Sequence, residues 1–234
     1  MKETMSINTV NRNLRRNIAL ANRIIRQQNE KTQPRKIVIV GPSRCGKTSL
    51  VKRFLDNSFT FQYKPTVEDC YNREYRYRGY NLSLDIIDIS GSFLSPPIRD
   101  AHIKTADVIM LVYEVENLES AKEARSLYKV IRQTREDKMP LILVGNKTDL
   151  KRGSLPPETF QESEEIVDIV NEIQGAKHIL TSAKCNMHIT DAFEYGLKDV
   201  IKRMHTLSMS AQQGKTNEYE ADKKWQKEQC CTIL

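Results

Sequence analysis

A glycine-rich segment at 41–48, Gly-Pro-Ser-Arg-Cys-Gly-Lys-Thr, constrains the fold more than any other part of the sequence. The pattern G-x-x-x-x-G-K-[ST] turns the backbone so that successive N–H groups face a chain of phosphates. Lys47 then reaches the β- and γ-phosphates, and the Thr48 hydroxyl is placed to bind Mg²⁺. An apolar run at 37–40 precedes the loop, and a helix is predicted over 47–56. The segment therefore predicts a buried strand, a phosphate-binding loop and a helix whose N-terminus favours an anion.

Two later motifs indicate which base the site accepts. They are Asn-Lys-Thr-Asp at 146–149 and Thr-Ser-Ala-Lys at 181–184, and each follows a short apolar run. The Asp149 carboxylate can accept two N–H bonds from guanine, a donor pair that adenine lacks, and the Lys147 stem can lie over the base. The Ala183 backbone N–H can reach the guanine carbonyl oxygen. Loops at the carboxyl ends of neighbouring strands share one edge of an open α/β sheet, so the sequence predicts a guanine nucleotide site there.

The alternation of apolar and amphipathic segments predicts an α/β fold of the P-loop NTPase class. This fold is a three-layer sandwich with helices on both faces of a six-stranded sheet. The sheet is mostly parallel, with one antiparallel edge pair joined by a turn at 78–81. The predicted strands lie near 36–40, 70–78, 81–88, 107–114, 140–145 and 177–181, and the predicted helices near 47–56, 118–135, 160–174 and 189–205.

Composition divides the chain into three parts. A basic extension at 1–34 precedes a nucleotide-binding domain at 35–205, and a polar tail follows at 206–234. No apolar run approaches the ~20 residues of a membrane span. The cysteines show no paired spacing, which favours a reducing compartment, and the histidines lack metal-ligand spacing. Cys45, beside Lys47, has two open roles: packing, or redox sensing through a lowered pKa.

The motifs occur in an order that resembles the Ras family of small GTP-binding proteins. The resemblance runs from about residue 36 to residue 205 and includes Asp-Ile-Ser-Gly at 88–91. A further segment at 63–71 resembles the family's effector loop, called switch I. The resemblance implies a GTP/GDP-binding switch that uses Mg²⁺, hydrolyses GTP and meets effector proteins through switch I. It also implies an exchange factor and an activating protein as partners.

The resemblance assigns further roles residue by residue. Thr66 is expected to bind Mg²⁺ and the γ-phosphate together with Thr48, while Asp88 holds the metal through water. Phe59 is expected edge-on to the base, and Tyr63 over the phosphates. The expected catalytic residues are Lys47, Thr66, Gly91, whose N–H contacts the γ-phosphate, and Ser92. The expected nucleotide-binding residues are Gly41, Pro42, Ser43, Arg44, Cys45, Gly46, Lys47, Thr48, Ser49, Phe59, Tyr63, Thr66, Asp88, Gly91, Asn146, Lys147, Asp149, Leu150, Ser182, Ala183 and Lys184. The effector loop is Tyr63, Lys64, Pro65, Thr66, Val67, Glu68, Asp69, Cys70 and Tyr71.

Two departures from the family pattern predict slow GTP hydrolysis. Ser92 stands where efficient members carry the glutamine that orients the attacking water, and a serine hydroxyl is too short for that task. Ser43 replaces a glycine and crowds the space that an activating protein's arginine enters. A single positioned donor is typically worth about 3 kcal/mol in the barrier. The alternative is that another group, such as Arg44 acting in cis, replaces the glutamine.

The region around switch II also departs from the family. Pro96 and Pro97 predict that any helix begins at or after Pro97 and runs to about Ile103. Alternating tyrosines at 71–77 predict a half-buried strand. Its exposed edge can add a partner's strand, or its tyrosines can lie on the protein's own helix; both interpretations stay open.

The C-terminal sequence Cys-Cys-Thr-Ile-Leu forms a prenylation box. Its terminal leucine favours a geranylgeranyl group on Cys231, and Cys230 can take a second, palmitoyl chain. One lipid gives marginal binding, so a second signal is expected. The sequence therefore predicts a lipid-anchored protein on the cytoplasmic face of the plasma membrane or an endomembrane.

The N-terminal extension carries the excess charge of the protein. Residues 1–36 contain nine Lys or Arg and two acidic residues, a net of +7 that equals the net charge of the whole chain. Within 12–26, apolar and arginine side chains fall on opposite faces of a helix. This arm suits an anionic membrane surface or a calmodulin-like groove; the alternatives are a presequence, an arm packed on the domain and a solvated tail. Nucleic acid is not expected, because no aromatic platform accompanies the charge, and we expect a monomer.

The sequence therefore predicts a membrane-anchored GTP-binding switch in signal transduction with slow intrinsic hydrolysis. The alternative is a constitutively GTP-bound module that recruits effectors without significant turnover. An ATP-using P-loop kinase is disfavoured by Asp149 and by the lack of a lid-like arginine cluster.

Overall fold

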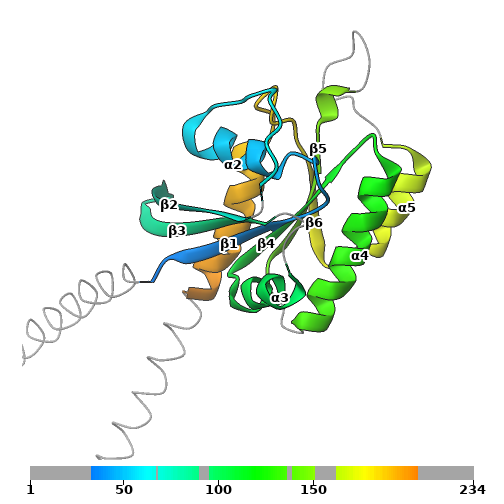
Figure 1. Ribbon diagram of the computed structural model, residues 1–234. Helices are drawn as coiled ribbons and strands as arrows, with labels where there is room; N and C mark the ends of the chain where they lie inside the picture. The colour runs from blue at the N-terminus through cyan, green and yellow to red at the C-terminus, as the bar shows by residue number, and fades with distance from the viewer. Residues whose placement is uncertain (1–32, 67, 90–94, 136–138, 151–161, 205–234) are drawn as a thin grey trace, which may run out of the picture.

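The computed structural model describes residues 33–66, 68–89, 95–135, 139–150 and 162–204. A six-stranded sheet lies between two layers of helices (Figure 1). The strands are β1 (Arg35–Val40), β2 (Glu68–Tyr77), β3 (Tyr80–Ile89), β4 (Val108–Glu114), β5 (Leu141–Asn146) and β6 (Ala176–Leu180). The helices are α2 (Lys47–Asp56), α3 (Pro96–Thr105), α4 (Leu118–Thr134), α5 (Glu164–Glu172) and a helix over 189–204, with a 3₁₀ turn, η2, at Thr148–Leu150.

The strand order is β2-β3-β1-β4-β5-β6. β1 lies in the middle and pairs in parallel with β3 and β4, and β5 and β6 continue the parallel set. Only β2 runs antiparallel, beside β3. The predicted fold class is confirmed in its strand number, its single antiparallel pair and its helices on both faces.

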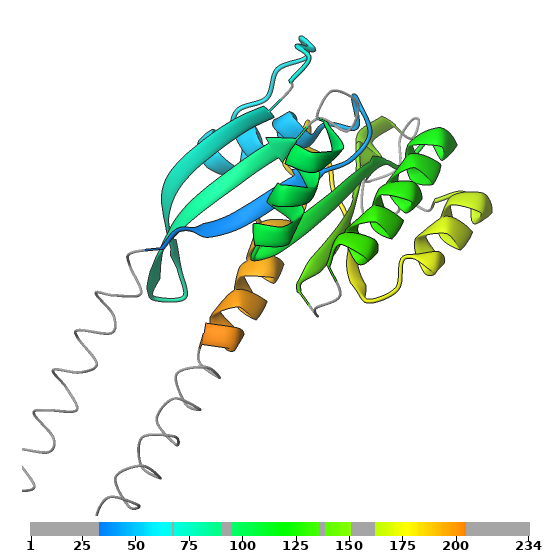
Figure 2. The ribbon, with the colours of Figure 1, turned by 60° about the horizontal axis from the view of Figure 1, so that its bottom comes forward.

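A two-residue turn closes the antiparallel pair, as the sequence predicts. Tyr77 is paired with Tyr80, and Arg78 and Gly79 between them have φ angles of 48° and 84°. Two successive left-handed residues form the turn whose twist matches that of the flanking strands. Figure 2 shows the resulting long hairpin of β2 and β3 at one edge of the sheet.

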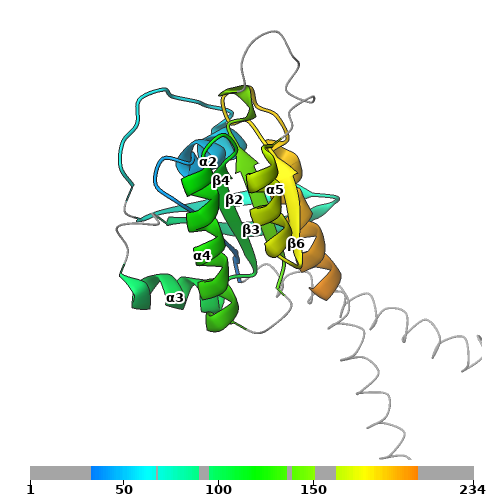
Figure 3. The same cartoon turned by 90° about the vertical axis from the view of Figure 1, so that its right-hand side faces the viewer.

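Each face of the sheet buries its own apolar cluster. On one face α2 and the helix over 189–204 meet, and the ring of Phe54 stacks on that of Phe193 with 4.0 Å between centroids. On the other face α3, α4 and α5 contribute buried residues such as Ile103, Ala121 and Ile166. Figure 3 shows α4 and α5 side by side over this face.

The prediction for α3 is wrong in its start. The helix begins at Pro96 and continues to Thr105, with prolines in its first two positions and extended Ser95 before it. The first N–H groups of a helix have no intrahelical acceptor, and proline's fixed φ suits a helix. Two prolines therefore fit in the first turn of α3, and the residue with the extended conformation is Ser95.

The tyrosine face of β2 lies on the protein's own helices. Tyr75 lies 5.0 Å from Phe54 between ring centroids, and its hydroxyl donates a 2.8 Å bond to Glu194. This contact bears out the interpretation of a strand packed on its own helix. β2 is also an edge strand with a neighbour on one side, so partner-strand addition stays a prediction.

Several predictions lie outside the described residues. They concern the arm at 1–32, Val67, Gly91 and Ser92, the region from residue 205, and the lipidation sites Cys230 and Cys231. The predicted domain limits also stay predictions. Among the described residues, none of the helices has the length and apolar character needed to cross a membrane.

A partly buried polar cluster joins β4, β6 and the segment before α5. The hydroxyl of Tyr113, a residue 1% exposed, donates to Glu162 and lies 2.8 Å from Nε2 of His178. Burial, with a smaller contribution from nearby Lys177, lowers the pKa of His178 to about 4. Burial also raises the pKa of Glu162. The imidazole is therefore neutral in the folded protein at pH 5, whereas in the unfolded chain it is protonated.

We predict that His178 makes the folded state less stable as pH falls from 7 to 5. The folded pKa of about 4 lies below the ordinary value of 6.5, so the unfolded chain binds more protons between these values. The free energy of unfolding should fall by about 1–2 kcal/mol more in the wild type than in His178→Asn. Urea unfolding at both pH values measures this, with His188→Asn at an exposed position as the control. Equal pH slopes in wild type and His178→Asn contradict the prediction.

Candidate nucleotide-binding site

Loops at the carboxyl ends of β1, β5 and β6 and the segment before β2 surround a cavity of about 810 Å³. This volume is typical of a small-molecule site. It brings together these predicted site residues: Ser43, Arg44, Gly46, Lys47, Thr48, Ser49, Phe59, Tyr63, Thr66, Asn146, Lys147, Asp149, Leu150, Ala183 and Lys184. Other lining residues were not in the predicted nucleotide set, namely Lys52, Thr60, Phe61, Gln62, Lys64, Pro65 and Asp69. The remaining described members of that set, Gly41, Pro42, Cys45, Asp88 and Ser182, do not line the cavity.

Close backbone approaches fix the shape of the phosphate loop. A Cβ on Gly41 would lie 2.1 Å from the Val112 carbonyl oxygen, so only glycine fits there. Gly46 has a φ of 96°, and a Cβ on it would lie 2.4 Å from Nδ2 of Asn146. The loop is therefore wedged between the ends of β4 and β5.

Lys47 is a buried cation at the start of α2. Its side chain folds back over the loop, and Nζ donates to the carbonyl oxygens of Gly41 at 2.9 Å and Pro42 at 2.7 Å. These bonds offset part of the cost of burying the charge. They hold the ammonium at the loop, where a phosphate chain meets the α2 N-terminus.

Three oxygen-bearing side chains converge beside this loop. Thr48 Oγ1 donates to Asp88 Oδ2 and lies 3.1 Å from Thr66 Oγ1. The other Asp88 oxygen, Oδ1, is buried without a hydrogen-bond partner, and burial raises the pKa of this carboxyl group. A buried carboxylate oxygen without a partner is costly, and a divalent cation would compensate it.

These residues fit Mg²⁺. Mg²⁺ takes hard oxygen ligands and is usually held by one or two carboxylates with waters and substrate phosphates. The described part of the chain contains no cluster of three or more His, Cys, Asp or Glu side chains able to hold a metal. Two hydroxyls and one carboxylate beside a phosphate loop therefore match a magnesium ion shared with a nucleotide.

The base end of the cavity is preorganised around Asp149. Its side chain is 9% exposed; Oδ1 accepts a 2.6 Å bond from Ser182 Oγ, and Oδ2 lies 3.6 Å from Lys184 Nζ. Lys147, with a φ of 68°, forms a 2.8 Å ion pair with Glu114. A carboxylate and a lysine stem thus line the cavity with their orientations set by neighbouring side chains.

One amide links the phosphate loop to the loop after β6. Nδ2 of Asn146 donates to the Cys45 carbonyl at 2.9 Å. Its Oδ1 accepts from Thr181 Oγ1 and from the Ala183 N–H, each at 3.2 Å. The Ala183 N–H was expected to face the guanine carbonyl; in this structure it donates to Asn146, and the base contact stays a prediction.

The start of switch I and the residues before it line the cavity. The Arg44 guanidinium lies 5.0 Å from the Tyr63 ring centroid, a cation–π contact between phosphate loop and switch I. Phe59 and Phe61 meet edge to face at 5.1 Å, and Phe61 is 82% exposed. The predicted positions of Phe59 and Tyr63 at the cavity agree with this geometry, while their contacts with a nucleotide stay predictions.

Cys45 is a packing residue. The thiol is fully buried, and desolvation raises its pKa despite the opposing charge of Lys47. Burial and a raised pKa favour packing over the redox alternative, which required a lowered pKa.

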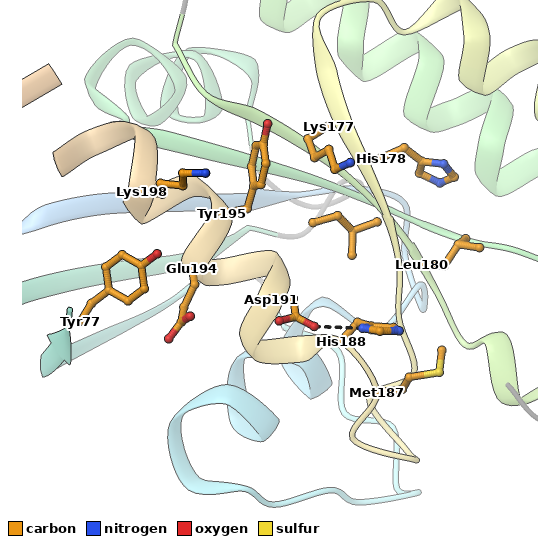
Figure 4. Close-up of a pocket in the computed structure, with 11 residues that line it drawn as sticks. Tyr77, Lys177, His178, Leu180, Met187, His188, Asp191, Glu194, Tyr195 and Lys198 are labelled. Carbon is orange, nitrogen blue, oxygen red and sulfur yellow. Dashed lines mark hydrogen bonds and ion pairs between the residues drawn. The ribbon is translucent and has the colours of Figure 1, made fainter. Parts of the chain in front are cut away.

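A second cavity, of about 660 Å³, lies between β6 and the helix over 189–204 (Figure 4). None of the predicted nucleotide residues lines it. Its polar side chains contact one another: His188 Nδ1 lies 2.9 Å from Asp191 Oδ2, and Lys177 Nζ lies 5.9 Å from the Tyr195 ring centroid. This cavity gives no indication of a ligand.

Sequence reasoning missed the residues that support the site from behind. Glu114 forms an ion pair with Lys147, and the Thr181 hydroxyl donates to Asn146 Oδ1. Arg53 of α2 donates to the Ala183 carbonyl at 2.8 Å. Glu114 closes an apolar strand and Thr181 is the first residue of the motif at 181–184, which is a weak positional signal. Arg53 carries no signal, because it belongs to an ordinary helical segment.

The chain is similar to known GTP-binding proteins. A sequence model described as the Ras family matches residues 36–202. The chain is 35% identical over 182 residues to the GTP-binding protein Rhes of Homo sapiens, covering 74% of this chain and 66% of that protein. It is 29% identical over 200 residues to Ras-like protein rasS of Dictyostelium discoideum, covering 85% of this chain and 98% of rasS. The chain thus spans slightly under two thirds of the length of the human Rhes protein.

We predict that Asp149 decides which base is bound. Asp149→Ala should weaken GDP binding at least ~100-fold and change ADP binding little, because two charge-assisted hydrogen bonds of roughly 1.5–3 kcal/mol each are lost. Calorimetry on nucleotide-stripped protein measures both affinities, with Asp191→Ala, outside the cavity, as the matched control. The prediction fails if the wild type does not prefer guanosine nucleotides or if Asp149→Ala binds GDP as the wild type does.

Proposed function

Because the chain belongs to the Ras family of small GTP-binding proteins, we propose that it is a lipid-anchored, GTP-dependent switch with slow intrinsic hydrolysis. The observation that carries the proposal is the cluster of Thr48, Thr66 and Asp88. Thr66 belongs to switch I and lies 3.1 Å from Thr48, the threonine of the phosphate loop, with an unpartnered oxygen of Asp88 alongside. A ligand that draws these oxygens together orders switch I against the phosphate loop.

The chain's own residues supply the difference between the two nucleotide states. Lys47 binds the β- and γ-phosphates, and Thr66 and the Gly91 N–H contact the γ-phosphate when GTP is bound. Mg²⁺, when bound, neutralises phosphate charge beside Thr48, Thr66 and Asp88. Loss of the γ-phosphate removes the contacts of Thr66 and Gly91, so both switch segments are released.

Partners are proposed from the surfaces that these contacts control. Effectors bind switch I at 63–71, and the free edge of β2 offers main-chain groups for pairing with a partner's strand. An exchange factor and an activating protein act on the same region. The geranylgeranyl group on Cys231, with a palmitoyl chain on Cys230 or the basic arm as second signal, holds the protein at the cytoplasmic face of the plasma membrane or an endomembrane.

We predict slow hydrolysis because Ser92 cannot orient the attacking water. Single-turnover hydrolysis of GTP by the purified chain should be slower than the intrinsic Ras rate of about 3–5 × 10⁻⁴ s⁻¹. Ser92→Gln should raise the rate at least ~10-fold, and Ser95→Gln, three residues further along, serves as the control. A wild-type rate at or above the Ras value, with no gain from Ser92→Gln, argues that Arg44 or another group replaces the glutamine.

A constitutively GTP-bound binding module is the second candidate. The Arg44–Tyr63 contact favours it, because it holds switch I on the phosphate loop through residues of this chain, and Ser43 crowds the approach of an activating arginine.

We predict that protein purified rapidly from cells carries mostly GDP, as a working switch does. Chromatography of the released nucleotide measures this, and mostly GTP supports the module.

A further inference from the structure

Arg53 reaches from α2 to the loop that follows β6. Its Nε donates to the Ala183 carbonyl oxygen at 2.8 Å, and its Nη2 donates to the Lys184 carbonyl oxygen at 3.1 Å. Two donors of one planar guanidinium thus bind two successive carbonyls, a geometry that a lysine ammonium cannot reproduce. These bonds join segments 130 and 131 residues apart in sequence.

The same guanidinium also fixes the end of α2. Its Nη1 donates to the Asn57 carbonyl at 2.8 Å, and Asn57 is the left-handed residue that caps the helix. Asn57 Oδ1 in turn accepts from Nδ2 of Asn186 at 3.1 Å. The loop containing residues 183–186 is therefore attached to the C-terminal end of α2 at three points.

A third contact connects Arg53 to Phe59, in the segment before switch I. The guanidinium carbon lies 5.7 Å from the Phe59 ring centroid, within cation–π range, and Phe59 lines the cavity. One side chain outside the cavity thus contacts both Phe59 and the loop of Ala183, the two elements expected at the base. α2 itself begins with Lys47 and Thr48 at the phosphate end.

Ala183 is held from both sides. Its N–H donates to Asn146 Oδ1 at 3.2 Å, and its carbonyl accepts from Arg53. The Asn146 bond fixes one end of the residue to β5, whereas the Arg53 bonds fix the next peptide to α2. Removing Arg53 leaves the two carbonyl oxygens to accept hydrogen bonds from water and lets the Ala183–Lys184 peptide rotate.

We propose that Arg53 is a positioning residue for guanine recognition. It sets the Ala183–Lys184 peptide and the Phe59 ring relative to the helix that holds the phosphates. It thereby fixes the place of Ala183, whose N–H, bonded to Asn146 Oδ1, is shared with the base carbonyl. The inference rests on the proposed function, since it requires a guanine nucleotide in the cavity. Arg53 does not contact the reacting atoms and acts through Ala183.

The test compares nucleotides that differ only in their base. This comparison separates a role of Arg53 in positioning Ala183 from a general contribution of Arg53 to folding. Affinities are measured for three diphosphates: GDP, inosine diphosphate, which keeps the carbonyl and lacks the 2-amino group, and 2-aminopurine riboside diphosphate, which keeps the amino group and lacks the carbonyl. Arg53→Gln should weaken GDP and inosine diphosphate by about tenfold each and the 2-aminopurine nucleotide by less than about threefold. Arg53→Lys should lose less than Arg53→Gln. Arg125→Gln, which breaks an ion pair with Glu172 on α5, is the control.

Each result decides the question. Losses confined to the carbonyl-bearing bases support the inference. Equal losses for all three diphosphates, or no loss in Arg53→Gln, overturn it. If the wild-type protein shows no preference for guanosine nucleotides, the proposed function itself is contradicted. The wild-type affinities alone give this result, before any variant is compared. If Arg53→Gln does not fold, the same comparison with Arg53→Lys decides.

Discussion

The site depends on one buried side chain, the amide of Asn146. It is 1% exposed and uses both ends: Nδ2 binds the phosphate loop through Cys45, and Oδ1 binds Thr181 and Ala183. Leaving a buried amide unpaired is costly. The phosphate loop and the loop after β6 are therefore most stable in the arrangement that pairs both ends of the Asn146 amide. The distance between the phosphate-binding and base-binding ends of the cavity is therefore fixed by β5 before a nucleotide enters.

Rigid and responsive parts of the cavity are supported differently. Loops at the ends of β5 and β6 are held by the Asn146 and Arg53 hydrogen bonds, whereas switch I meets the phosphate loop through Thr48–Thr66 and Arg44–Tyr63. Phe61 and Tyr63 are 82% and 49% exposed. Few buried contacts make a segment cheap to move, so switch I, where the γ-phosphate contacts are proposed, is the part of the cavity wall that costs least to rearrange.

The sequence predicts what fixed spacing and periodicity determine. Glycines and a lysine at set intervals place the phosphate loop, and Arg78-Gly79 places the hairpin turn. Apolar runs, and alternating tyrosines for β2, place the strands. Partners distant in sequence were not predictable. Nothing in the segment around Arg53 indicates Ala183 as its acceptor, and Glu114 pairs with Lys147 only because β4 and β5 are neighbours. The predicted start of α3 was wrong for an identifiable reason. A residue before proline usually has an extended conformation, but the first turn of a helix tolerates proline, so Pro96 is helical although Pro97 follows it.

β6 lies at the edge of the sheet and is the last strand among the described residues. During synthesis on a ribosome, the phosphate loop and Asp149 emerge before Ser182, Ala183 and the carbonyls that Arg53 binds. The contacts that hold Asp149 and Ala183 therefore form only after residues 182–184 have been synthesised. The base end of the cavity is completed only when β6 pairs with β5 and Ser182 comes to lie beside Asp149.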